Sequence, residues 1–323
     1  MITVEHLVKR YGSLYALNDV SFSIGEGEIV GLLGPNGAGK STAMNILTGY
    51  LSSTAGDVRV GGVSIKDDPM TVKKLIGFLP EQPPLYVDMT VDEYLSFVYE
   101  LKGCELPREE HINHVLGVVK LTDVRARLIR NLSKGYRQRV GIAQALIGDP
   151  KVIVFDEPTV GLDPKQILEV RNLLRSLGRD HTVILSTHIL AEVQAVCERV
   201  IIMNHGKVIA DERTDDLTRT VAEGYRYEAK IIGPRSDVRT ALEAITGIRA
   251  VTPTGERDGE ALVFHIEGER GSDIRRSVFD ICVAGGWPLV GLAPVATDLE
   301  TVFIRLVDKA DGVDAPSRKR RGR

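Results

Sequence analysis

One eight-residue segment carries the residue types that bind phosphate groups. It reads Gly34-Pro35-Asn36-Gly37-Ala38-Gly39-Lys40-Ser41 and matches the pattern G-x-x-x-x-G-K-[ST]. Its glycines let backbone N–H groups turn inward around phosphate oxygens. The pattern predicts that Lys40 bridges the β- and γ-phosphates of a nucleotide and that Ser41 holds Mg²⁺.

The sequence around this loop supports phosphate binding over a chance match in a turn. An apolar strand is expected at Ile29–Leu33 and a helix from about Ser41 to Thr48. Strand, loop and helix in this order are the context that a phosphate loop needs. The positive end of such a helix would also point at the bound phosphates.

Two carboxylates follow a second apolar strand. Asp156 and Glu157 come directly after the strand expected at 152–155, and ligands bind at the carboxyl ends of such strands. Asp156 is expected to support Mg²⁺, and Glu157 is then free to act as a general base on water. An ordinary acidic turn is the alternative, which the presence of the glycine loop disfavours.

A third segment begins a helix and could form another phosphate site. Ser133 is a good N-cap residue, and Gly135 leaves backbone N–H groups accessible at the helix start. From the residues alone, a capped surface helix is the favoured interpretation.

In chain order, these segments resemble the ATP-binding subunit of an ABC transporter. The resemblance extends over roughly residues 2–215 and includes three further matches. Gly161-Leu162-Asp163-Pro164 resembles the D-loop, and Ser186-Thr187-His188 resembles the segment with the switch histidine. Tyr11 falls where the family stacks an aromatic ring on adenine.

The resemblance implies a homodimer with ATP at the interface. Ser133 and Gly135 of one subunit then contact the nucleotide of the other, and Asp163 lies at the dimer seam. The implied catalytic residues are Glu157, His188 and Lys40, with His188 contacting the γ-phosphate. The implied Mg²⁺ ligands are Ser41, Glu81 and Asp156. The implied ATP contacts are Tyr11, Gly34, Pro35, Asn36, Gly37, Ala38, Gly39, Lys40, Ser41, Thr42, Ser133 and Gly135.

The chain departs from the family pattern in two places. Lys134 interrupts the usual Leu-Ser-Gly-Gly-Gln, and Glu81 stands where the Q-loop glutamine is expected, with Gln82 one step later. Both departures are similar to subunits of ABC-2-type exporters, of the drug-resistance or gliding-motility kind. The segments 83–86 and 298–303 also look like that subgroup. This implies a separate polytopic permease that holds the subunit at the cytoplasmic face of the membrane.

The expected elements of residues 1–215 define a mixed α/β domain. Residues 1–30 and 56–80 read as short antiparallel strands, and 90–146 as an all-helical insertion that begins near 84. Continuous apolar strands predict a mostly parallel core sheet; they are 152–155, 183–185 and 200–203. With the resemblance, this is a phosphate-loop NTPase with a RecA-like core, an antiparallel β-subdomain and a helical subdomain.

A second, smaller domain is expected at 222–308. Its strands and helices follow the order β-α-β-β-α-β, which is the ferredoxin-like motif, and one amphipathic helix is expected at 298–308. This domain would bind a metabolite or brace the dimer, and bracing is the favoured role. Residues 309–323 form a basic tail that we expect to be disordered. A solvated terminus is favoured for it over contact with RNA or anionic lipid.

Composition narrows the function classes. The net charge of −3 and the pI of about 6.2 argue against a basic field that would hold nucleic acid, and no specific nucleic acid is expected. The three cysteines are too dispersed for a zinc clamp, and no apolar run approaches the roughly 20 residues of a membrane span. A soluble ATPase switch acting on the ribosome or nucleic acid is the alternative; a single cassette without heptads disfavours it.

Overall fold

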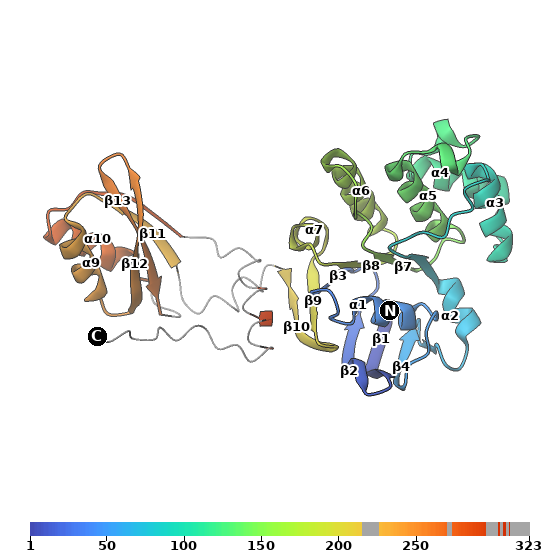
Figure 1. The fold of residues 1–323 in the computed structure, drawn as a ribbon, viewed down its shortest axis with the longest axis horizontal. Helices are drawn as coiled ribbons and strands as arrows, with labels where there is room; N and C mark the ends of the chain where they lie inside the picture. The colour runs from blue at the N-terminus through green and yellow to red at the C-terminus, as the bar shows by residue number, and fades with distance from the viewer. Residues whose placement is uncertain (215–225, 270–272, 295–302, 304–305, 308–309, 311–323) are drawn as a thin grey trace. The chain divides into compact units, whose positions relative to one another are not determined.

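The 323-residue chain folds into two compact units. The computed structural model describes residues 1–214, 226–269, 273–294 and the single positions 303, 306, 307 and 310. Of the described residues, Met1–Thr214 and Ala310 belong to the first unit, and 226–269, 273–294 and the positions 303, 306 and 307 belong to the second. Each described unit has its own hydrophobic core. The motifs with expected chemistry all belong to the first unit (Figure 1).

A six-stranded sheet forms the centre of the first unit. Five of its strands are parallel, and β10 pairs antiparallel at one edge. In spatial order they are β10 (Lys207–Arg213), β9 (Arg199–Asn204), β3 (Ile29–Leu33), β8 (Thr182–Thr187), β7 (Val152–Asp156) and β6 (Ile76–Leu79). The mostly parallel core sheet is confirmed. Beyond the strand expected at 200–203, β10 adds an edge strand that the apolar pattern did not predict.

This sheet brings the sequence motifs to one edge. Strands β3, β8 and β7 are neighbours, and every residue of β7 and β8 is buried. Helix α1 (Lys40–Leu47) follows the loop after β3, in agreement with the expected helix. Because parallel strands end at the same edge, the segments after β3, β7 and β8 lie together.

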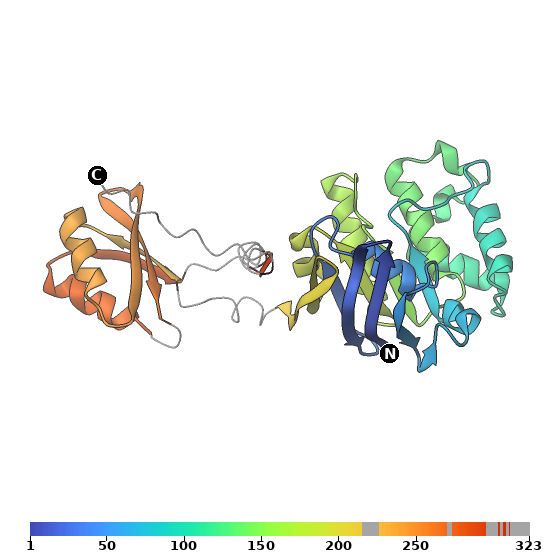
Figure 2. The same cartoon turned by 60° about the horizontal axis from the view of Figure 1, so that its bottom comes forward.

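A second sheet is wholly antiparallel and appears at the front of Figure 2. Its strand order is β2 (Leu14–Ile24), β1 (Ile2–Tyr11), β4 (Ala55–Val60) and β5 (Val63–Ser64). The expectation of short strands in residues 1–30 was wrong, since β1 and β2 are 10 and 11 residues long. Register shifts interrupt their pairing, and His6 and Asp19 have positive φ. These irregularities break the apolar alternation and make one long strand look like two.

Part of the segment 56–80 is helical, which corrects a second expectation. Helix α2 (Pro69–Leu75) lies between β5 and β6. Asp68 caps it by accepting a hydrogen bond of 3.0 Å from the Thr71 N–H, and Pro69 occupies the first turn. An aspartate N-cap followed by proline is a typical helix start.

The helical insertion is confirmed. Figure 1 shows its helices as a group beside the core sheet. They are α3 (Val91–Leu101), α4 (Arg108–Val118), the short 3₁₀ turns Thr122–Val124 and Ile129–Asn131, and α5 (Lys134–Leu146). Thr90 and Glu93 form a capping box at the start of α3. Two further helices flank the sheet, α6 (Pro164–Leu177) and α7 (Leu190–Val196).

The described part of the second unit is a four-stranded antiparallel sheet with two helices. Its elements follow in the order β11 (Arg226–Ile231), α9 (Arg235–Glu243), β12 (Ile248–Asp258), β13 (Ala261–Gly268), α10 (Arg275–Ala284) and β14 (Leu289–Pro294). The spatial order is β12-β13-β11-β14, and all three pairs are antiparallel. Val238, Leu242, Val278 and Phe264 share its buried core. The β-α-β-β-α-β order thus matches the one expected from the sequence.

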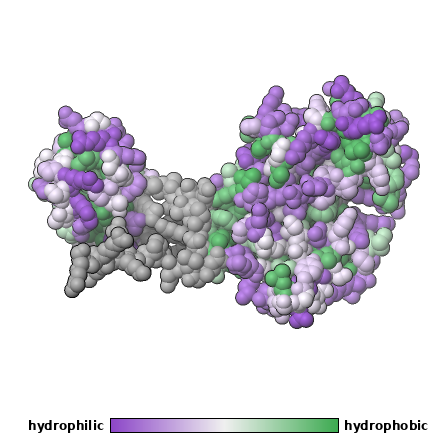
Figure 3. All heavy atoms as spheres, viewed as in Figure 1, coloured by the Kyte–Doolittle hydropathy of each residue, from purple (hydrophilic) through white to green (hydrophobic). Residues whose placement is uncertain are grey.

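Some expectations fall on residues that the structure leaves undescribed. They are the basic tail 309–323 and, apart from a few single positions, the amphipathic helix at 298–308. Among the described residues, no helix has both the length and the apolar character required to span a bilayer. Hydrophilic residues predominate on the face drawn in Figure 3, where hydrophobic residues form separate patches.

Candidate active site

The phosphate loop closes directly onto helix α1. Gly39 is the N-cap of that helix and has a φ of 103°, a backbone conformation that favours glycine. A Cβ atom at Gly39 would also lie 2.7 Å from the carbonyl oxygen of Ala16. Both the conformation and the close approach therefore require glycine here. The first N–H groups of α1 lack an intrahelical partner and are available to a phosphate.

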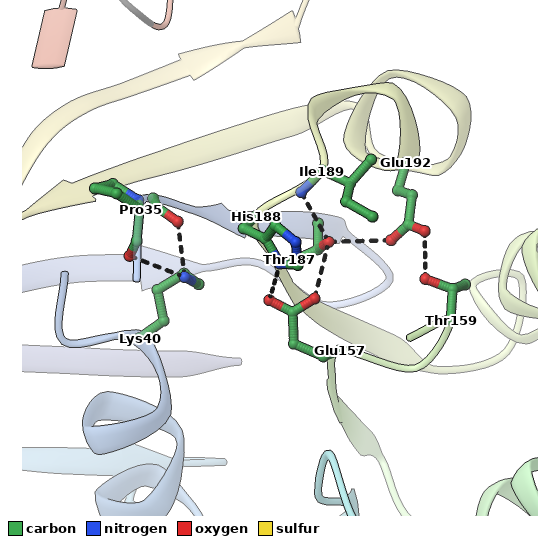
Figure 4. Close-up of polar contacts among 9 residues, drawn as sticks. Pro35, Lys40, Glu157, Thr159, Thr187, His188, Ile189 and Glu192 are labelled. Carbon is green, nitrogen blue, oxygen red and sulfur yellow. Dashed lines mark hydrogen bonds and ion pairs between the residues drawn. The ribbon is translucent and has the colours of Figure 1, made fainter. Parts of the chain in front are cut away.

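Lys40 is held inside its own loop. Its Nζ donates hydrogen bonds of 2.7 Å to the Gly34 carbonyl and 3.3 Å to the Pro35 carbonyl (Figure 4). The residue is 6% exposed. Burial lowers the pKa of Lys40, and the negative charges of Glu157 and Asp156 oppose this effect. The loop thus holds a cation where the predicted phosphates would bind.

Asp156 and Glu157 lie at the end of β7, and both are buried. The Oδ1 atom of Asp156 is inaccessible to solvent and has no hydrogen-bond partner among the described residues. Glu157 has a φ of 49°, which is uncommon for a residue with a Cβ atom. Its N–H donates a hydrogen bond of 2.9 Å to the carbonyl of Ser186 on β8.

His188 contacts Glu157 directly after β8. The His188 Nδ1 atom lies 2.8 Å from Glu157 Oε1 (Figure 4). The Thr187 hydroxyl lies 3.3 Å from the other carboxylate oxygen, Oε2. The expected base and the expected switch histidine therefore meet at the ends of neighbouring strands.

One cavity of about 530 Å³ brings most of the predicted site together. Eleven of the predicted residues line it: Tyr11, Asn36, Gly37, Ala38, Gly39, Lys40, Ser41, Thr42, Glu81, Glu157 and His188. Gln82 is not among the lining residues, so Glu81 is the member of that pair beside the phosphate loop. The cavity joins the antiparallel sheet, the phosphate loop and the ends of β6, β7 and β8.

The remaining predicted residues lie outside the cavity lining. Gly34 and Pro35 contribute the carbonyls that hold Lys40, and Asp156 is buried at the end of β7. Ser133 and Gly135 begin helix α5, where the Ser133 side chain accepts a hydrogen bond from the Tyr136 N–H. Within one chain, this helix start is not part of the phosphate cavity.

Several lining residues escaped the sequence analysis: Leu14, Tyr15, Ala16, Val160 and His205. Tyr15 follows Tyr11 by four positions across the β1–β2 turn, so paired aromatics around Gly12 were a usable signal. His205 lies in the β9–β10 turn, where the Gly206 N–H donates to the Ala38 carbonyl at 3.0 Å. That long-range contact leaves no local pattern in the sequence.

Sheet order, phosphate loop and paired carboxylates define a phosphate-loop NTPase, and known proteins agree. The family model described as "ABC transporter" matches residues 17–160. The uncharacterized ABC transporter ATP-binding protein YxlF of Bacillus subtilis is 39% identical over 64% of this chain and 69% of its own length. The linearmycin resistance ATP-binding protein LnrL of the same species is 32% identical, over 78% of this chain and 82% of that protein.

Solved structures give the same result. A dimeric ATP-binding cassette in a post-hydrolysis state, bound to ADP and Pi, has a TM-score of 0.60 and 30% identity, covering 66% of this chain and 98% of that one. Some relatives are much longer: the chain matches 27% of the ABC transporter A family member 1 of Dictyostelium discoideum. The chain belongs to the ABC transporter ATP-binding proteins. It is an ATP-hydrolysing subunit that energises a membrane permease.

Proposed function

We propose that two copies of this chain hydrolyse ATP between them and drive export through a polytopic permease on a separate chain. The observation that carries this proposal is the convergence of Lys40, Glu157 and His188 on one cavity beside the phosphate loop. A cation, a carboxylate and an imidazole around a phosphate site are the groups that phosphoryl transfer to water requires.

The residues present fit a magnesium ion. Asp156 Oδ1 is a buried carboxylate oxygen without a partner in the described chain, and leaving such an atom unsatisfied costs free energy. Oxygen ligands of this kind are what Mg²⁺ prefers. We assign Asp156 and Ser41 to this ion, with Glu81 as a third ligand. The ion would neutralise charge on the phosphates.

Each of three side chains has a distinct role in hydrolysis. Lys40 exchanges its contacts with the Gly34 and Pro35 carbonyls for oxygens of the β- and γ-phosphates. Glu157 accepts a proton from the water that attacks the γ-phosphate. His188 contacts the same phosphate and orients the Glu157 carboxylate through the 2.8 Å contact.

Two of the predicted ATP contacts lie away from the phosphate cavity of their own chain, which supports the dimer. Ser133 and Gly135 start helix α5 outside it, where their N–H groups can meet the ATP of a second copy. Gly135 also permits close packing, because a Cβ atom there would lie 2.6 Å from Gln166 Cδ at the start of α6. In this arrangement each ATP binds between the loop of one copy and α5 of the other.

A groove of about 490 Å³ supports docking of a permease. Tyr50, Tyr86 and Leu101 line it and are 76%, 56% and 73% exposed, which is unusual for large apolar side chains. Pro80 and Pro84 also line this groove, while Glu81 between them lines the ATP cavity. One short segment therefore borders both sites and can transmit closure of the ATP site to a docked permease helix.

Export is the direction that the relatives favour. LnrL is named for linearmycin resistance, and SrtF of Streptococcus pyogenes, 36% identical over 67% of this chain and 92% of its own length, for lantibiotic transport. A transporter subunit named for resistance to a compound fits removal of that compound from the cell. We therefore assign outward transport to the complex that this subunit energises.

The catalytic assignment is tested with Glu157→Gln. The amide cannot accept the proton from water, so steady-state ATPase activity should fall by about 100-fold or more. ATP binding should persist, and the variant should form an ATP-stabilised dimer on size-exclusion chromatography. Glu198→Gln, the same change at an exposed glutamate, is the control. Wild-type turnover of Glu157→Gln would refute the assignment.

Capture from gently solubilised membranes tests the permease. The tagged chain should recover a polytopic membrane protein, and Tyr86→Glu should reduce recovery because it places a charge in the apolar groove. Leu168→Glu, at an exposed position on α6, is the matched control. Recovery of ribosomes in place of a membrane protein would contradict the transport function.

A further inference from the structure

A buried glutamate lies directly behind the proposed catalytic groups and is not one of them. Glu192 lies in the first turn of α7 and is 1% exposed. Its Oε2 atom accepts a hydrogen bond of 3.0 Å from the Thr187 hydroxyl, and its Oε1 atom accepts one from the Thr159 hydroxyl (Figure 4). A buried carboxylate is costly unless its oxygens have donors, and here each oxygen has one.

The two hydroxyl groups come from the segments that carry the proposed chemistry. Thr187 directly precedes His188, and Thr159 follows Glu157 by two residues. Glu192 thus connects the end of β8 with the turn after β7. Figure 4 shows these residues as one chain of polar contacts from Glu157 through Thr187 and Glu192 to Thr159.

Thr187 can satisfy only one carboxylate at a time. Its oxygen accepts a hydrogen bond of 3.1 Å from the Ile189 N–H, and its single proton has two possible acceptors. Glu192 Oε2 lies at 3.0 Å and Glu157 Oε2 at 3.3 Å, so the shorter contact favours donation to Glu192. When the Thr187 proton points to Glu192, Glu157 Oε2 remains free to accept a proton from water.

We propose that Glu192 is a positioning residue for ATP hydrolysis. It draws the Thr187 hydroxyl proton away from Glu157 and fixes the segments that carry Glu157 and His188 relative to each other. This inference rests on the proposed function, in which Glu157 is the base. Glu192 itself does not line the ATP cavity.

The contact with Thr159 extends this role to the proposed dimer seam. Thr159 precedes Val160, which lines the ATP cavity, and the Gly161–Asp163 segment that leads into α6. Movement of His188 against a terminal phosphate would therefore pull on that segment through Thr187, Glu192 and Thr159. We expect the Glu192 carboxylate to position both the residues that hydrolyse ATP and the segment that contacts the second copy.

Glu192→Gln is the primary test, measured on the full chain. The carboxylate of Glu192 accepts a hydrogen bond from each threonine hydroxyl, but an amide can accept from only one and must donate to the other. The substitution therefore reverses the direction of one of these two hydrogen bonds. We expect kcat to fall about 10- to 100-fold, as for a misplacement of about 1 Å, while KM for ATP changes less than about threefold. Like Glu157→Gln, the variant should accumulate an ATP-bound dimer on size-exclusion chromatography.

Changes at Thr187 keep the proposal testable if Glu192→Gln folds poorly. Thr187→Ser retains the hydroxyl and should keep near wild-type kcat, whereas Thr187→Val removes it and should lose activity as Glu192→Gln does. Combining Thr187→Val with Glu192→Gln should add little to either single change, because both interrupt one network. Glu198→Gln again controls for loss of a carboxylate.

The outcomes separate this proposal from the one on which it rests. Wild-type kcat in Glu192→Gln, with an inactive Glu157→Gln, would overturn only the role of Glu192. A loss of activity that matches the loss of folded protein in thermal melts would also overturn it. Wild-type turnover of Glu157→Gln would instead refute the catalytic assignment itself.

Discussion

At the scale of single residues, Glu157 combines backbone strain with its proposed role as the catalytic base. Its φ of 49° costs on the order of 1–3 kcal/mol for a residue with a side chain. The surroundings hold this conformation through the bond to the Ser186 carbonyl and the contacts with Thr187 and His188. Glycine would relieve the strain but remove the carboxylate. The strained backbone therefore places the carboxylate of the proposed base at the cavity.

Lys40 leads to a prediction about ATP affinity. Its buried ammonium is held within the phosphate loop by the Gly34 carbonyl. A hydrogen bond from this cation to a phosphate would contribute about 1.5–3 kcal/mol to the free energy of ATP binding. Lys40→Met should therefore weaken ATP binding by about 10- to 100-fold, measured by isothermal titration calorimetry. Lys151→Met, at an exposed lysine, should bind ATP normally. Equal affinity in the two variants would show that Lys40 does not reach the phosphates.

At the scale of elements, one lysine joins two helices of the helical insertion. Lys102, the C-cap residue of α3, donates to carbonyls near the end of α5. The distances are 3.2 Å to Gln144, 3.4 Å to Ala145 and 2.7 Å to Ile147. A cation suits the negative end of a helix. Burial nevertheless lowers the pKa of Lys102 from 10.5 to about 8, against a weaker opposing effect of Cys104.

Because the pKa of Lys102 is lowered, the free energy of unfolding changes with pH in the alkaline range. Between about pH 8 and 10.5 the unfolded chain binds more protons at Lys102 than the folded chain does, so the contribution of this group to stability rises with pH. Below about pH 8 both states are protonated, and the contribution is constant. Across this window, the free energy of unfolding of the wild type should increase by about 3 kcal/mol relative to that of Lys102→Met. Urea denaturation at several pH values measures it, and a flat difference would contradict the pKa shift.

Elements with a strong local pattern could be predicted from the sequence. The buried strands, the helical insertion and the capping box at Thr90 each have a short-range signal. One error arose where long-range pairing decides the structure, because bulges at His6 and Asp19 interrupt the pattern of two long strands. The other concerns α2, whose local signal, the cap at Asp68 followed by Pro69, lies within an otherwise strand-like region.

In the candidate site, too, the residues with a local sequence pattern could be predicted, and those placed by the fold could not. The phosphate loop and the Asp156–Glu157 pair are contiguous in sequence, so their spacing revealed them. His205 is brought to the cavity by the β9–β10 turn, and Glu192 is placed behind His188 by helix α7. A buried carboxylate between two threonines has no sequence signature, because its partners are 5 and 33 positions away.

At the scale of the whole molecule, the two units have separate cores. In the first unit both sheets contribute to one cluster, which contains Val4, Leu32 and Met203. The second unit packs Tyr227 and Ile266 among residues of its own helices. Every residue found to line the ATP cavity belongs to the first unit. The residues that line this cavity therefore belong to one unit, and the second unit contributes none of them.

A truncation after Thr214 tests this separation. The fragment Met1–Thr214 should bind ATP with an affinity within about threefold of the full chain, since it keeps the complete cavity and core. Calorimetric titration of both proteins measures this, and circular dichroism checks that the fragment is folded. A folded fragment with much weaker ATP binding would assign the second unit a part in nucleotide binding.

The segment from Pro80 to Pro84 has a consequence for how transporters diversify. Glu81 faces the ATP cavity, whereas its proline neighbours line the aromatic groove. In the proposed function, the chemistry and the choice of permease therefore depend on different side chains of the same stretch. Groove residues such as Tyr50 and Tyr86 can change without altering the catalytic groups. We expect that exchanging these groove residues between related subunits will change which permease each subunit binds. The groove surface would then determine the specificity of assembly.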